Sequence, residues 1–451
     1  MFKTDQQTLT DINALDWNSN SLLRFFDHTL TIGGRDELYG CLLRPLSDKG
    51  AIVDRQEAIA YLATLQLDKL FDKYMMVDLE SYLQMPKKYH SESVLIYFVD
   101  KLSSNFLSLH YKKERLFIRQ SVKEIAMLLI AMYDLFTQSI QSKQRIGILA
   151  SYAQQFAVFW DDLDEQELRQ LIKHKNPLRL VLKYDQLFRS PKKSVLQELF
   201  KMLYMLDALY AVAKMCNKGN LCFPHMHGEQ GKGALLNIKG MYNLALEKPV
   251  KNDVHIDAFQ NIWFLTGANM TGKSTLLKSV ASCIHLAHMG FPVPASSMET
   301  VLFKGMMTSI NLADSLSAGY SHFFAEVHRL KIMAESIAAH GPMVIMLDEI
   351  FKGTNYQDAY EATAQLIDHI SGIDKSLFIL STHITDLEAS VKENERVALK
   401  YLETKVDTDH GVSFTYKLVD GIATEKLGMW ILKQEAVLES FRAIRSGITT
   451  S

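Results

Sequence analysis

Cysteine is scarce in this sequence, with four residues among 451, at positions 41, 216, 222 and 283. They form no C-x-x-C pair and no metal-ligand spacing. We therefore expect neither a disulfide framework nor a cysteine-ligated metal site. The thiols are predicted to be reduced, as in a cytoplasmic protein.

Long hydrophobic runs and an excess of one charge are also missing. The longest apolar run, residues 125–133, has nine residues and is too short to span a bilayer. The polar start from Met1 to Gln7 has no signal-peptide core, so no membrane is expected. A net charge of −2 indicates little about partners, because a near-neutral total can hide a basic face. With 48% apolar and 22% charged residues, the chain is predicted to be soluble and globular.

Glycine and proline are rare between residues 51 and 218, where Gly147 is the single glycine. So long a stretch without helix breakers predicts long helices. Within it, apolar residues recur at steps of three and four, which gives one helix face suited to packing: Leu196, Leu199, Phe200, Leu203, Leu206 and Leu209. We predict an all-helical domain over residues 1–235.

The pattern changes beyond about residue 233. Short apolar runs at 262–265, 344–347 and 377–380 are each followed by a polar or glycine-rich turn and then a helical pattern. Buried strands that alternate with helices predict an α/β domain with a mostly parallel sheet, over residues 236–451. Its functional residues are expected at the carboxyl ends of the strands.

A phosphate-binding loop follows the first of these strands. It fits G-x-x-x-x-G-K-[ST], and with the next residue it comprises Gly267, Ala268, Asn269, Met270, Thr271, Gly272, Lys273, Ser274 and Thr275. Glycines let successive N–H groups point at phosphate oxygens, and the following helix N-terminus adds partial positive charge. Lys273 is predicted to reach the β- and γ-phosphates of ATP, and Ser274 to ligate Mg²⁺. The alternative, a chance match in a strand-turn-helix, is disfavoured by the flanking strand and helix.

Two acids, Asp348 and Glu349, end the second strand, and His383 follows the third. Asp348 is predicted to hold Mg²⁺, and Glu349 to act as general base on the attacking water. His383 is a candidate to contact the γ-phosphate or that water. The alternatives are a solvated turn for the acids and a capping or surface role for the histidine. The phosphate loop upstream favours the catalytic interpretation.

A loop of small polar residues, 314–323, lies between these motifs and leads into a helical stretch. Such a loop at a helix N-terminus predicts a second anion site. The alternative is a plain helix cap by Ser321 with no ligand.

Together these segments resemble the MutS family of DNA mismatch-repair ATPases. Residues 266–275 (TGANMTGKST) are similar to the family's T-G-P-N-M-G-G-K-S-T, and residues 348–355 (DEIFKGTN) to D-E-L-G-R-G-T-S. Residues 381–383 match A-T-H, and residues 316–323 match L-x-x-G-x-S-T-F, in the same order. Residues 26–46 and 205–213 resemble the opening and the closing helix of the family's helical core, or lever, domain.

The resemblance implies an ABC-type P-loop ATPase that works as a dimer, here a homodimer. Lys273, Glu349 and His383 would serve hydrolysis in one subunit, and Gly319 and Ser321 of the other would complete its nucleotide site. ATP would close the dimer, and the long helices would transmit closure to a region that holds DNA.

Several segments depart from the family pattern. The mismatch-reading domain is expected to be absent, and the clamp region, about 105–195, to be reduced and helical. Phe351 and Lys352 stand where the family has Gly-Arg, which puts a subunit contact beside the acids in doubt. The helical tail over 429–445 is a candidate dimerisation element.

Basic clusters in the helical half give a partner hypothesis. They comprise Lys87, Lys88, Lys112, Lys113, Arg115, Lys173, Lys175, Arg179, Arg189, Lys192 and Lys193. Phosphate contacts from such clusters would be sensitive to salt and would depend on the structure of DNA rather than its sequence. The alternative, which is favoured for any single cluster, is a solvated helix face. Three hypotheses remain: an ATP-gated DNA clamp for mismatched or branched DNA, an ATPase acting on RNA or the ribosome, and a nucleotide-gated dimerisation scaffold.

Overall fold

The computed structural model describes residues 2–68, 70–71, 73–85, 109–141, 147–174, 177–216, 218–228, 233–268, 270–310, 322–407, 411–423 and 437–445. The chain forms two compact units. One contains Met1–Phe25, Leu42–Ile52 and Gly219–Ser451, and the other contains Phe26–Cys41 and Val53–Lys218. We call them the α/β unit and the helical unit.

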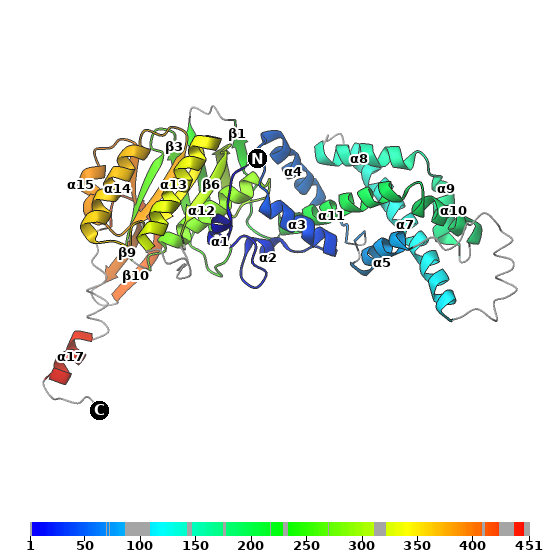
Figure 1. Cartoon of the computed structure of the whole chain (residues 1–451), viewed down its shortest axis with the longest axis horizontal. Helices are drawn as coiled ribbons and strands as arrows, with labels where there is room; N and C mark the ends of the chain where they lie inside the picture. The colour runs from blue at the N-terminus through cyan, green and yellow to red at the C-terminus, as the bar shows by residue number, and fades with distance from the viewer. Residues whose placement is uncertain are drawn as a thin grey trace. The chain divides into compact units, whose positions relative to one another are not determined.

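Helices make up most of the described part of the helical unit (Figure 1). They are α3 (Ile32–Leu43), α4 (Lys49–Leu62), α5 (Lys73–Gln84), α7 (Leu109–Gln141), α8 (Gly147–Trp160), α9 (Glu165–Lys173), α10 (Leu178–Arg189) and α11 (Lys193–Cys216). On α7, Val122, Ile125 and Leu129 are buried at steps of three and four, and the same spacing buries Leu196, Leu199 and Leu203 on α11. The described part of the predicted clamp region is helical.

A buried carboxylate joins α3 to α11. Asp207 is fully buried and accepts hydrogen bonds from Leu30 N at 3.0 Å, Thr31 N at 2.8 Å and Thr31 Oγ1 at 2.6 Å. These contacts satisfy donors just before α3 begins. A Cβ on Gly34 would lie 2.2 Å from Asp207 Oδ2, so the two helices meet where α3 has no side chain.

The α/β unit is built on a six-stranded sheet (Figure 1). Its order is β10 (Gly411–Asp420), β9 (Val397–Asp407), β4 (Ile262–Thr266), β8 (Leu377–Thr382), β7 (Met343–Asp348) and β6 (Gly305–Ser309). Only the β10–β9 pairing is antiparallel. A helical N-terminal region followed by an α/β domain with a mostly parallel main sheet is therefore confirmed.

A second, four-stranded sheet was not predicted. Its order is β1 (His225–His227), β5 (Ser297–Val301), β2 (Ala234–Met241) and β3 (Asn252–Asp257). The β1–β5 pairing is parallel and the other two are antiparallel. β1 and β5 are three and five residues long, so neither carries a clear alternating pattern in the sequence.

The main sheet is buried on both faces. One face meets α13 (His322–His340) and α14 (Tyr356–Ile370) in a single apolar cluster that includes Ile262, Phe264, Ile345, Leu347, Phe378, Leu380, Met333 and Ile367. Alternate strand residues point the opposite way. There α12 (Lys273–His288), which takes no part in that cluster, contacts β7 and β8. The strands are nearly continuous apolar runs because both of their faces are covered.

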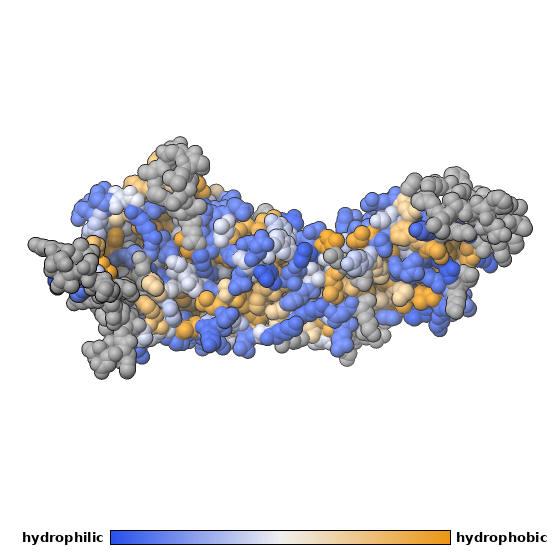
Figure 2. Space-filling model, turned by 90° about the horizontal axis from the view of Figure 1, so that it is seen from below, coloured by the Kyte–Doolittle hydropathy of each residue, from blue (hydrophilic) through white to orange (hydrophobic). Residues whose placement is uncertain are grey.

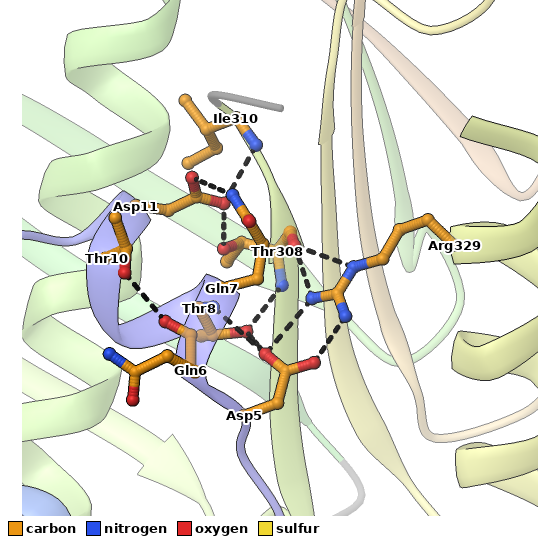
Figure 3. A network of polar contacts seen from close by, with 9 residues as sticks. All are labelled: Asp5, Gln6, Gln7, Thr8, Thr10, Asp11, Thr308, Ile310 and Arg329. Carbon is orange, nitrogen blue, oxygen red and sulfur yellow. Dashed lines mark hydrogen bonds and ion pairs between the residues drawn. The ribbon is translucent and has the colours of Figure 1, made fainter. Parts of the chain in front are cut away.

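Residues from the start of the chain complete this unit (Figure 3). Lys3 pairs with Gly305 as a short parallel extension of the sheet beyond β6, and α1 (Gln6–Asp11) follows. Asp11 is fully buried and accepts from Thr308 Oγ1 at 2.6 Å and from Ile310 N at 2.9 Å. Asp5 caps α1 by accepting from Thr8 N at 3.0 Å.

Hydrophilic and hydrophobic residues are both present on the surface. On the face in Figure 2, hydrophilic side chains alternate with small hydrophobic patches. Over the ranges described, no helix is both long enough and apolar enough to cross a membrane.

Candidate nucleotide site

The carboxyl ends of three neighbouring strands bring the predicted motifs together. The order β4–β8–β7 places β8 in the middle, and the register pairs Thr266 with Thr382 and Asp348 with Ser381. The residue that follows β8, His383, therefore lies between the loop after β4 and the acids that end β7. This explains how motifs more than 30 residues apart in sequence share one site.

The phosphate loop has the backbone that glycine permits. Gly267 has φ +148° and Gly272 has φ +97°, and Gly272 caps the start of α12. Met270 adopts φ +71° without being a glycine, and its side chain is exposed. Thr271 Oγ1 donates to Ala268 O at 2.9 Å, which ties the loop to itself. The loop backbone thus curves tightly, with left-handed residues, and leads directly into the N-terminus of α12.

Lys273 is buried within this curve, with 4% of its surface exposed. Its Nζ donates to Gly267 O at 2.7 Å and to Ala268 O at 3.0 Å. Its pKa is lowered to about 8, chiefly by burial; the charge of Asp348 opposes this shift and that of Lys352 adds to it. Among the described residues, the ammonium donates to these carbonyl oxygens, and an entering phosphate would give it a stronger partner.

Ser274 and Asp348 form the predicted metal pair. The Ser274 hydroxyl donates to Asp348 Oδ2, and Asp348 Oδ1 is buried without a hydrogen-bond partner. A buried carboxylate oxygen with no donor is suited to a cation. One carboxylate and one hydroxyl fit Mg²⁺, which retains waters and shares phosphate oxygens rather than filling an all-protein cage.

Glu349 is engaged on both carboxylate oxygens. His383 Nε2 lies 2.5 Å from Glu349 Oε1, and Lys352 forms an ion pair with Glu349 Oε2. His383 Nδ1 lies 3.1 Å from Gly267 O, so the imidazole bridges the phosphate loop and the acid. Burial, and next the charge of Lys273, lower the pKa of His383 below its ordinary value. The contact between Nε2 and Oε1 requires a proton on one of the two atoms.

A cavity of about 570 Å³ adjoins the loop. Gly272, Lys273, Ser274 and Thr275 line one side of it, and Glu349 reaches it as well. The residues that line its other sides include Tyr242, Leu246, Pro249, Leu402 and Tyr416. Tyr416 has φ +55° at an irregularity of β10, and its Cδ1 would lie 3.2 Å from a Cβ on Gly272.

The structure therefore gathers Gly267, Ala268, Met270, Thr271, Gly272, Lys273, Ser274, Thr275, Asp348, Glu349 and His383 in one place. Asn269, Gly319 and Ser321 lie outside the described residues. Other residues of the site, among them Lys352 and Tyr416, were not predicted to belong to it. Lys352 differs from the family motif at its position, and Tyr416 carries no signal in the sequence.

Comparison with known proteins agrees with this geometry. The profile of MutS domain V matches residues 263–441. The "DNA mismatch repair protein MutS" of Fusobacterium nucleatum is 30% identical over 248 residues, which is 54% of this chain and 27% of that protein. The proteins of the same name from Orientia tsutsugamushi (strain Boryong) and Staphylococcus haemolyticus are each 28% identical, over 50% and 53% of this chain and 26% and 27% of their own lengths.

The matched part spans about a quarter of the length of these relatives. It contains β4, β7 and β8 with the motifs that follow them. Residues 263–441 therefore match MutS domain V, an ATPase domain, and the C-terminal half of this chain is homologous to the MutS mismatch-repair proteins.

Proposed function

We propose that this protein binds ATP with Mg²⁺ and hydrolyses it, and that ATP closes a homodimer which acts on DNA in mismatch repair or on branched DNA. One observation supports the proposal above all. His383 bridges Gly267 O and Glu349 while Ser274 donates to Asp348, so phosphate-binding, metal-binding and basic groups converge at three strand ends.

Each residue has a chemical task in this proposal. Lys273 exchanges its carbonyl partners for phosphate oxygens, and the N–H groups of the loop and α12 surround the same charge. Ser274 and Asp348 would hold Mg²⁺, which neutralises phosphate charge. Glu349 accepts the proton of the attacking water, and His383 keeps the carboxylate oriented and receives or returns that proton. The cavity lined by Tyr242 and Tyr416 would accommodate the nucleoside part.

Glu349 cannot act while Lys352 occupies its second oxygen. A catalytic base whose charge is already neutralised polarises water poorly, so release of Lys352 is a step of this mechanism. We assign Gly319 and Ser321 to the partner subunit's nucleotide, which makes hydrolysis depend on dimer closure. α17 (Val437–Arg445) exposes Leu438 and Phe441, which suits a helix that packs against a second copy.

Contact with DNA would use the helical unit. Two of its basic residues form ion pairs within the chain: Arg189 pairs with Asp185, and Lys192 pairs with Asp162. Lys173 and Arg179 are exposed and keep their charges available to phosphate. Lys87, Lys88 and Lys175 lie outside the described residues. Action on RNA or the ribosome, and a scaffold that dimerises on ATP without DNA, are the alternatives, in each case in the cytoplasm.

The decisive experiment measures ATP turnover with homoduplex, mismatched and four-way DNA over a range of salt. Stimulation by one of these structures, lost as salt rises, is expected. Absence of binding to any DNA at low salt would contradict the DNA assignment and leave the other two. Copurified ribosomal RNA would favour action on RNA or the ribosome.

A Glu349→Gln variant tests the mechanism separately. It should bind ATP, hydrolyse it about 10² to 10⁴ times more slowly, and accumulate as an ATP-bound dimer in light scattering. A variant that stays monomeric with ATP would refute the model in which Ser321 acts across the dimer.

A further inference from the structure

The loop that carries Glu349 is strained at two residues. Glu349 has φ +52° and Phe351 has φ +62°, a left-handed conformation that residues with a Cβ rarely adopt. Such strain persists only where the surroundings over-determine the backbone, and it concentrates at functional sites. The contacts that hold this loop therefore decide where the Glu349 carboxylate lies.

Those contacts come from the first turn of α13. The rings of Phe351 and Phe323 lie 5.9 Å apart at an interplanar angle of 52°. Phe351 is 5% exposed and belongs to the apolar cluster under the sheet, against which Phe323 packs. A Cβ on Gly353 would lie 2.5 Å from Phe323 N, so the loop backbone lies directly against the α13 backbone.

α13 is itself fixed further along its length (Figure 3). The Arg329 guanidinium, 8% exposed as a residue, donates to Thr308 O at 2.7 Å and forms an ion pair with Asp5. Thr308 belongs to β6 and Asp5 to the chain start, so α13 is tied to two elements that do not carry the catalytic residues. A charged group buried among several partners allows little movement of the helix.

We propose that Phe351 is a positioning residue for hydrolysis: its ring against Phe323 fastens the Glu349 loop to the start of α13. Without the ring, the loop loses the contact that offsets its strain, and the carboxylate loses its fixed position against His383. ATP binding does not require that position, because Lys273 and the phosphate loop belong to β4 and α12. The proposal rests on the catalytic role assigned above to Glu349.

The test compares Phe351→Ala, Phe351→Leu and Phe351→Gly in the full chain. Phe351→Ala should slow single-turnover ATP hydrolysis by about 10- to 100-fold, because small misplacements of a catalytic group have effects of this order. The dissociation constant of a fluorescent ATP analogue should change by less than about twofold. Phe351→Leu should fall in between, since it keeps part of the contact. Phe351→Gly should be as slow as alanine although glycine accepts the positive φ, because the ring is what is lost.

Phe324→Ala is the matched control. Phe324 neighbours Phe323 on α13 but is 50% exposed and stacks on His328 instead, so hydrolysis should remain at the wild-type rate. Phe323→Ala should resemble Phe351→Ala, and the double variant should be no slower than the slower single one, as expected for two halves of one contact.

A folded Phe351→Ala variant that binds the analogue and hydrolyses ATP at the wild-type rate would overturn the proposal. So would additive effects of the two alanine substitutions. If Phe351→Ala does not fold, Phe351→Leu and Phe323→Leu carry the same comparison.

Glu349→Gln separates the positioning role of Phe351 from the catalytic role of Glu349. If it abolishes hydrolysis while the Phe351 variants are unaffected, only the positioning role fails. If it hydrolyses ATP normally, both fail.

Discussion

Lys273 should take up a proton when ATP binds at alkaline pH. Its pKa before nucleotide binds is about 8, against an ordinary 10.5, chiefly because the group is buried. This lowering corresponds to about 3 kcal/mol of disfavoured charge. Nucleotide phosphates restore a strong partner, so binding returns the pKa toward or above its ordinary value. At pH 9 about 0.9 of the Lys273 side chains are neutral before nucleotide binds, and each must be protonated on binding.

Calorimetry of a non-hydrolysable ATP analogue in two buffers of different ionisation enthalpy measures this uptake. We expect about 0.5 proton at pH 8 and about 0.9 at pH 9, with affinity about fivefold weaker at pH 9. Lys273→Arg is the control, because a guanidinium stays charged and should take up no proton.

The same lowering has a consequence for the empty protein, with a definite sign. Between pH 8 and 10.5 the unfolded chain binds more protons at Lys273 than the folded chain does. The contribution of this group to stability must therefore rise with pH across that window, by up to about 3 kcal/mol.

In the calorimetry experiment, uptake of less than about 0.2 proton at pH 9 would refute the reasoning, because Lys273 would then be charged before ATP arrives.

Two further predictions concern charges near the site and behind it. Lys352→Gln should raise the pKa of both Lys273 and His383, since the Lys352 charge lowers each of them; an unchanged His383 titration by NMR would contradict this. His285 and His288 are fully buried on α12, and burial lowers the pKa of each to about 4. The free energy of unfolding in urea should therefore fall as pH falls from 6.5 toward 4, by on the order of 3 kcal/mol per histidine. In His288→Gln, the dependence of this free energy on pH should be about half as steep. Equal slopes in both proteins would rule out this origin.

Local sequence was enough to predict the core of the candidate site. The phosphate loop is continuous in sequence, and the acids and His383 each follow a buried apolar strand, so strand ends and motifs could be recognised together. Their convergence still required the strand order, which places β8 between β4 and β7. The roles of Gly319 and Ser321 stay predictions, since those residues lie outside the described part of the chain.

The remaining features depend on contacts that leave no local pattern. Asp5 meets Arg329 across 324 positions of sequence, and nothing around either residue indicates the other. Tyr416 reaches the cavity only because β10 is irregular there. Phe351 could be identified as a departure from a motif, but its partner Phe323 belongs to another element and becomes visible only in the folded chain.

The placement of the chain start in the α/β unit sets an order for folding during synthesis. Asp5 and Arg329 are 324 residues apart, so at about 5 to 20 residues per second a ribosome needs about 15 to 65 s to pass from one to the other. Until α12 and β6 have been made, Phe2 and Leu9, which are 3% and 4% exposed in the finished protein, lack the elements they pack against. The intervening helical unit ends at Lys218, so all of it has been synthesised before α12. The earliest-made segment is thus among the last to dock, and until it does, a nascent chain presents this apolar segment to chaperones.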